Sequence, residues 1–133
     1  MKVLVVDDEA IVLKSCRLVL EDEGCEVLLA SSVAEAMPMI AEHAPTLLLV
    51  DVKMPLQDGM YLLRQMREQG LCIPVIVMSG FSTAETIREA QDLGALSFIS
   101  KPFTPDELAQ TIRSVLKTLE KELRHGKKES SGD

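Results

Sequence analysis

The chain has 133 residues, of which 47% are hydrophobic and 3% aromatic, and its formal net charge is −7. This length suits one domain that buries a core without metals or disulfides to hold it together. The negative charge argues against direct binding of nucleic acid, which needs a basic face, and no apolar run is long enough to span a membrane. With no signal-peptide pattern at its start, the chain is expected to be cytoplasmic, with three reduced cysteines.

Short apolar runs alternate with stretches of helical periodicity along the whole chain. The apolar runs predict strands over residues 3–6, 25–30, 46–50, 73–78 and 96–100. The periodic stretches predict helices over residues 9–23, 31–44, 58–69, 82–92 and 104 to about 124. In the second helix, Ser32 and Glu35 have the spacing of a capping box, whereas Pro38 predicts a kink or a late start.

Five strands, each followed by a helix, indicate an α/β domain with a parallel sheet covered by helices on both faces. We expect this domain over residues 1–120 and a charged, frayed tail or linker start over 121–133. Leu116 and Leu123 continue the apolar positions of the last helix into the charged stretch. They are compatible with a frayed helix end, a coiled-coil entry to an absent output domain, or a dimer contact. We favour a stand-alone domain over one cut in a linker.

Chemically active side chains stand where the predicted strands end. They are Asp7 and Asp8 after the first strand, Asp51 after the third, Ser79 after the fourth and Lys101 after the fifth. Because ligands of open parallel sheets bind outside the carboxyl ends of the strands, we expect these five residues to converge. Clustered carboxylates need a shared cation, and Mg²⁺ prefers such oxygen ligands. Singly, each residue is better explained as a solvated strand end, a helix cap or a turn residue.

Asp51 has the properties of a nucleophile for phosphoryl transfer. A carboxylate can form an acyl phosphate when a metal ion and a cation offset the growing charge. Lys101 would supply that cation, and Ser79 would donate a hydrogen bond to a phosphoryl oxygen. The added negative charge would then bias a two-state surface made of the helix over 82–92, the strand over 96–100 and the last helix.

Four segments together match a known family in order and spacing. They are VLVVDDE, LLLVDVKMPLQDGMYLLRQMR, VIVMSG and GALSFISKPF. The chain resembles the receiver domain of two-component response regulators over residues 1 to about 120. The resemblance implies a flavodoxin-like doubly wound (βα)5 fold whose five parallel strands have the order 2-1-3-4-5. It implies a phosphorylation-activated signalling switch that catalyses only its own phosphoryl transfer and slow dephosphorylation.

The resemblance also assigns the acidic residues. Asp51 would be the phosphoacceptor, taking its phosphoryl group from a sensor histidine kinase, a phosphotransfer protein or a small phosphodonor. Asp8, Asp51 and the Lys53 backbone carbonyl would bind Mg²⁺ directly, and Asp7 would act through water. The Lys53 side chain prompts a further hypothesis: it neutralises the acid cluster and shields the acyl phosphate from water. The alternative is a solvated lysine that points past the site.

Two residues are assigned to switching by the same resemblance. Ser79 would be the hydroxyl that moves toward the phosphoryl group, and Phe98 would be the aromatic switch residue. Without the surrounding motif, Phe98 is better explained as core packing. The Lys101–Pro102 bond matches a peptide bond that is commonly cis in receivers.

Several further expectations and rival interpretations accompany this one. The target would be a downstream protein or a missing output domain, and phosphorylation is compatible with homodimer formation.

The chain would alternatively be a pseudo-receiver that docks proteins without phosphorylation, or the truncated N-terminal receiver of a multidomain transcriptional regulator. A haloacid dehalogenase-type phosphatase needs a second aspartate where Lys53 stands. A flavin carrier needs a phosphate-binding loop where this chain has acids after the first strand.

Overall fold

The computed structural model describes residues 1–54, 58–80 and 83–132, and their side chains as far as residue 122. Five strands form one sheet in the order β2-β1-β3-β4-β5, and every neighbouring pair is parallel. The strands are β1 (Lys2–Val6), β2 (Glu26–Ala30), β3 (Leu47–Asp51), β4 (Val75–Ser79) and β5 (Ser97–Ser100). The predicted fold class and strand order are therefore confirmed.

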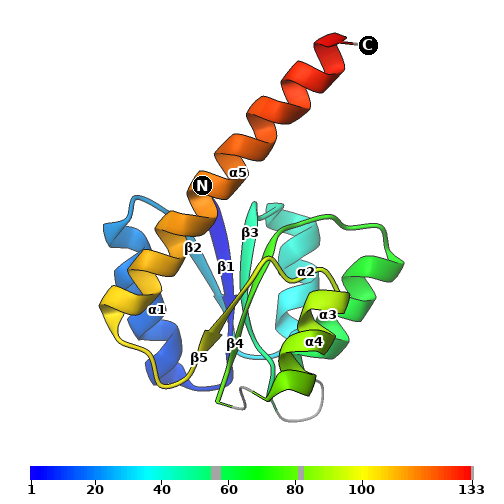
Figure 1. Cartoon of the computed structure of the whole chain (residues 1–133). Helices are drawn as coiled ribbons and strands as arrows, with labels where there is room; N and C mark the ends of the chain where they lie inside the picture. Colours follow the sequence, from blue (N-terminus) through cyan, green and yellow to red (C-terminus); the bar gives the residue numbers. More distant parts are fainter. Residues whose placement is uncertain (55–57, 81–82, 133) are drawn as a thin grey trace.

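The helices lie in two layers, one on each face of the sheet. They are α1 (Ala10–Asp22), α2 (Val33–His43), α3 (Gly59–Glu68), α4 (Ala84–Asp92) and α5 (Pro105–Gly132). Helices α1 and α5 cover one face, and α2, α3 and α4 cover the other (Figure 1). In the part of the chain that the structure describes, no helix has the length and apolar character that crossing a bilayer requires.

The central strands are buried on both faces, which explains their nearly continuous apolar sequences. In β1, Val3 and Val5 pack on the side of α1 and α5, while Leu4 and Val6 pack on the other side. All five residues of β3 are buried, including its last residue, Asp51. A rigid, fully covered strand thus fixes the position of this carboxylate.

Helix α2 has a capping pattern at its start and a proline in its interior. Ser32 caps the helix, since its side chain accepts a hydrogen bond from the Glu35 N–H at 3.1 Å. The Glu35 carboxylate returns to the Ser31 N–H at 2.8 Å, one residue earlier than in a capping box. Because the helix begins at Val33 and Pro38 lies inside it, the late start is wrong. The kink at Pro38 stays a prediction.

Helix α5 is longer than the sequence pattern predicted. It continues to Gly132, beyond the end expected near residue 124, and its last turns project away from the sheet (Figure 1). Leu108, Ile112 and Val115 anchor its first half in the core. The segment 117–124 that follows contains mainly strong helix formers and no proline, so nothing in it stops the helix. The domain boundary near residue 120 stays a prediction.

Gly59 lets the start of α3 lie directly against the end of β3. Its N–H donates to the Val52 carbonyl oxygen at 2.9 Å. A Cβ atom at this position would overlap the Asp51 carbonyl oxygen and lie 2.8 Å from Cγ1 of Val50. The absence of a side chain at Gly59 therefore helps to set the position of the Asp51 backbone.

We predict that Gly59→Ala lowers the free energy of unfolding by about 1–3 kcal/mol, because a new methyl group must displace backbone atoms of β3. Urea denaturation measures this change. Gly80→Ala is a matched control, since a Cβ there meets nothing within 4 Å. Equal stability of the two variants would show that α3 and β3 are not in such close contact.

Candidate functional site

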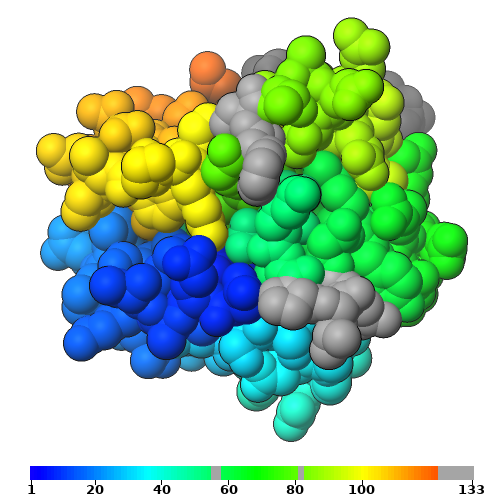
Figure 2. All heavy atoms as spheres, turned by 90° about the horizontal axis from the view of Figure 1, so that it is seen from below, coloured from blue at the N-terminus to red at the C-terminus, as the bar shows by residue number. Residues whose placement is uncertain are grey.

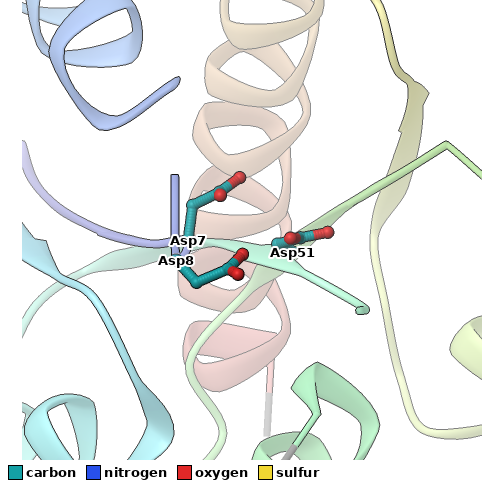
Figure 3. A group of neighbouring side chains, drawn as sticks. All are labelled: Asp7, Asp8 and Asp51. Carbon is teal, nitrogen blue, oxygen red and sulfur yellow. The ribbon is translucent and has the colours of Figure 1, made fainter. Parts of the chain in front are cut away.

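Three carboxylates face one another at the carboxyl edge of the sheet. Asp7 and Asp8 follow β1, Asp51 ends the neighbouring strand β3, and one oxygen of each lies within 4.8 Å of the others (Figure 3). Asp7 and Asp51 are buried, whereas Asp8 is exposed. The structure thus brings the three predicted acids together at the point where the strand order reverses.

Figure 2 shows this edge of the sheet from outside. The dark blue segment after β1, the blue-green segment after β3 and the yellow segment after β5 meet on this face. Asp51 lies in a cavity of about 480 Å³ whose walls include Lys53, Lys101, Gly80 and the first turns of α1. The Asp51 carboxylate is thus part of the cavity wall, although it is almost fully buried.

Lys101 is shared by three carboxylates. Its Nζ lies 2.6 Å from Oδ2 of Asp7, 3.4 Å from Oδ2 of Asp51 and 3.6 Å from Oε1 of Glu9. Burial alone would lower the pKa of Lys101, but the hydrogen bond to Asp7 and the two buried carboxylates raise it above its usual value. Lys101 is therefore charged and already in contact with carboxylates in this structure.

One lysine does not offset the charge that is buried here. Burial, followed by the charge of Asp7, raises the pKa of Asp51 to about 6, although Lys101 acts in the opposite direction. Burial also raises the pKa of Asp7, against the hydrogen bond from Lys101. The site therefore has too little positive charge to balance its buried carboxylates, and a divalent cation would provide the missing charge.

The donor set fits a hard cation such as Mg²⁺. Mg²⁺ takes oxygen ligands, commonly one or two carboxylates with water and phosphate oxygens completing the shell. Asp8 and Asp51 offer such oxygens, and the exposure of Asp8 leaves room for water. The Lys53 N–H donates to Oδ1 of Asp51 at 3.3 Å, which holds the chain after β3 close to the acids.

The predicted switch residues lie on the two strands beyond β3. Ser79 ends β4 and is fully buried, and its carbonyl oxygen accepts a hydrogen bond from the Lys101 N–H at 2.8 Å. Phe98 of β5 pairs with Val77 of β4. Its side chain is partly buried and packs on the core cluster beneath α2, α3 and α4. Core packing of Phe98 is thus observed, while its switch role stays a prediction. The Lys101–Pro102 peptide bond is cis, as expected.

Glu9 is the site residue for which no role was predicted. Its carboxylate is the third ionic partner of Lys101, and it lies on the wall of the cavity next to Asp51. The signal in the sequence was its position directly after the two acids of DDE. That position alone does not distinguish a residue facing the cavity from one facing solvent.

A doubly wound sheet with clustered carboxylates and a lysine at its switch point belongs to the class of open α/β domains whose ligand sites lie at this edge. Residues 3–113 match the family model of the response regulator receiver domain. The chain therefore belongs to this family.

Individual relatives show how much of a longer protein this chain spans. It is 37% identical over 117 residues to response regulator MprA of Mycobacterium avium, which covers 88% of this chain and 51% of MprA. Identity to regulatory protein AtoC of Escherichia coli is 33% over 126 residues, covering 93% of this chain and 27% of AtoC. The chain thus spans about half the length of MprA.

A solved structure matches the domain over nearly its full length. The CheY-like receiver domain protein of Methanospirillum hungatei has a TM-score of 0.83 at 31% identity. The match covers 91% of this chain and 97% of that one. The fold described above is thus that of a receiver domain.

The raised pKa of Asp51 predicts a pH-dependent stability difference. In the metal-free protein, ionisation of Asp51 is harder in the folded chain than in the unfolded one, so stability falls as pH rises from about 4 through about 6. Asp51→Asn cannot ionise at this position, so it avoids this fall in stability. Its free energy of unfolding should therefore be higher than that of wild type, by a difference that grows to about 2–3 kcal/mol above pH 6.

Urea denaturation with a chelator present, at a series of pH values across this range, measures the difference. Asp22→Asn controls for the loss of one negative charge from the exposed surface of α1. A constant difference between Asp51→Asn and wild type at all pH values would contradict the raised pKa.

Proposed function

We propose that this chain is a phosphorylation-activated signalling switch of a two-component system, with Asp51 as the phosphoacceptor. The observation that carries the proposal is the buried Asp51 carboxylate, reached through a cavity and lying 3.4 Å from Lys101 beside two further carboxylates. Membership of the receiver family supports it. A carboxylate in this setting can act as a nucleophile when its charge is balanced.

The metal would be held by Asp8, Asp51 and the Lys53 backbone carbonyl, with Asp7 acting through water. When bound, Mg²⁺ supplies the positive charge that the buried acids lack. An Asp51 oxygen would attack phosphorus, and the bond from phosphorus to the donor would break, so that the leaving group departs with the bonding electron pair. Lys101 and the Ser79 hydroxyl would then contact separate phosphoryl oxygens.

The change at the site would be transmitted to the surface of α4, β5 and α5. Within α4, Ala90 is the buried residue, and the rest of the helix is at least partly exposed. A helix anchored so lightly can shift at low cost when Ser79 and Phe98 move. Such a surface would contact a downstream protein or output domain, or a second copy of the chain.

The phosphodonor would be a sensor histidine kinase or a phosphotransfer protein in the cytoplasm. Ile11 on the cavity wall and Leu18, about two turns further along α1, have exposed fractions of 73% and 62%, which are high for large apolar side chains. An apolar face next to the acceptor suits a protein donor that must bring its histidine to Asp51. No role in nucleic-acid binding is proposed for this acidic domain.

We predict that acetyl phosphate with Mg²⁺ adds one phosphoryl group to the wild-type chain, and that Asp51→Asn abolishes the adduct. Intact-mass measurement detects it, and omission of Mg²⁺ should reduce its amount strongly because the buried acids then lack their cation. An adduct of equal amount on Asp51→Asn would reassign the phosphoacceptor.

The same measurement separates this proposal from a pseudo-receiver. A pseudo-receiver docks its partner without phosphorylation, so wild type would stay unmodified with acetyl phosphate and with a histidine kinase. The presence of Asp51, Asp8 and Lys101 in one cluster favours the phosphorylated switch.

We predict that Lys53→Ala shortens the lifetime of the aspartyl phosphate about three- to fivefold, since a partly screened charge near the site contributes up to about 1 kcal/mol. Lys53 lies on the cavity wall beside Asp51, where its cation would shield the acyl phosphate from water. Lys14→Ala, on the exposed surface of α1, is the matched control. Intact-mass measurements at intervals after removal of the donor give the lifetimes. Equal lifetimes in wild type and Lys53→Ala would refute the shielding role.

A further inference from the structure

Glu9 occupies an unusual position at the rim of the cavity. Its backbone N–H donates to Oδ1 of Asp7 at 2.9 Å, which holds the Glu9 backbone close to Asp7. It is the N-cap residue of α1, yet its side chain makes no capping hydrogen bond. The carboxylate instead turns to Lys101, at 3.6 Å, and its side chain remains 58% exposed. Glu9 is therefore a charged group of the cavity more than a part of the helix cap.

The charge of Glu9 is poorly balanced at this position. Lys101 lies closer to Asp7 and to Asp51 than to Glu9, and both of those carboxylates are buried. One lysine thus faces three carboxylates, and Glu9 is the most exposed of the three. Because Glu9 is part of the cavity wall, an anionic donor that enters the cavity comes close to this negative charge. Coulomb repulsion at such short range is not fully screened by salt.

We propose that Glu9 is a specificity-determining residue that disfavours strongly anionic small phosphodonors relative to less anionic ones. This inference rests on the proposed function, in which Asp51 accepts the phosphoryl group. Glu9 raises the energy of a donor in proportion to the negative charge that the donor brings. It thereby favours donors such as a phosphohistidine on a protein over freely diffusing acyl phosphates.

Two small donors that differ in charge test this inference. Near neutral pH, acetyl phosphate carries more negative charge than phosphoramidate, whose nitrogen is protonated. Both deliver the same phosphoryl group to the same carboxylate, so the ratio of their second-order rate constants isolates the effect of donor charge. Rapid-quench time courses read by intact mass give both constants in the presence of Mg²⁺.

Glu9→Gln keeps the size of the side chain and removes its charge. It should raise the acetyl phosphate rate constant about threefold relative to that of phosphoramidate, the magnitude expected for one charge a few ångströms from an anion in a largely aqueous cavity. Glu9→Asp keeps the charge and should leave the ratio near the wild-type value. Added salt should shift the wild-type ratio toward that of Glu9→Gln.

Glu21→Gln is the matched control on the same helix. Glu21 is exposed and lies twelve residues further along the chain, about 18 Å along the helix axis. At this separation, beyond the Debye length of about 8 Å, its charge is screened from the cavity. Glu21→Gln should therefore leave the ratio of the two rate constants unchanged.

The outcomes separate this inference from the proposed function. A ratio that is the same in wild type and Glu9→Gln would overturn the specificity role while leaving Asp51 as the phosphoacceptor. Equal acceleration with both donors would also overturn it, since it would point to a repositioned Lys101 and not to donor charge. If wild type reacts with neither donor, the proposed function fails, and this inference fails with it.

Discussion

The site depends on one constraint, the burial of two carboxylates side by side. Asp7 follows β1 and Asp51 ends the adjacent strand β3, and both are almost fully enclosed. Burying an unpaired charge is costly. Lys101 makes the arrangement possible by bridging both, at 2.6 and 3.4 Å. The bridge is incomplete, because one positive charge cannot balance two buried negative ones and Glu9 as well. Burial and the charge of Asp7 together raise the pKa of Asp51, and a bound cation would offset this cost.

The rest of the fold keeps these charges at a fixed separation. Strands β1 and β3 are held between two layers of apolar side chains, so neither carboxylate can retreat into water without opening the core. Gly59 allows α3 to close against the end of β3, which limits movement of the Asp51 backbone. The unfavourable electrostatics are thus maintained by hydrophobic packing, and binding of a cation would relieve them without rearranging the strands.

Much of this arrangement could be predicted from the sequence, but the contacts of Lys101 and the length of α5 could not. Parallel strands place their carboxyl ends at one edge, so the convergence of Asp7, Asp8 and Asp51 follows from the alternating pattern. The strand order came from the resemblance. The sharing of Lys101 among three carboxylates could not be predicted, because it depends on side-chain distances between groups separated by 94 positions in the chain. The length of α5 was underestimated because Gly126, which follows two basic residues in a polar stretch, resembles a helix end, whereas the helix continues through it.

The partners of Lys101 bear on how a change at Asp51 would reach the surface. A phosphoryl group on Asp51 would compete with Asp7 and Glu9 for the same ammonium group, so Lys101 must redistribute its contacts. Its backbone N–H is hydrogen-bonded to the Ser79 carbonyl oxygen, which joins the two residues expected to contact the phosphoryl group. A displacement of Ser79 at the end of β4 would therefore also move Lys101, which follows β5, and the reverse holds as well. From the end of β5 the chain enters α5, and from the end of β4 it leads to α4, which has fewer buried residues than α2 or α3 on the same face.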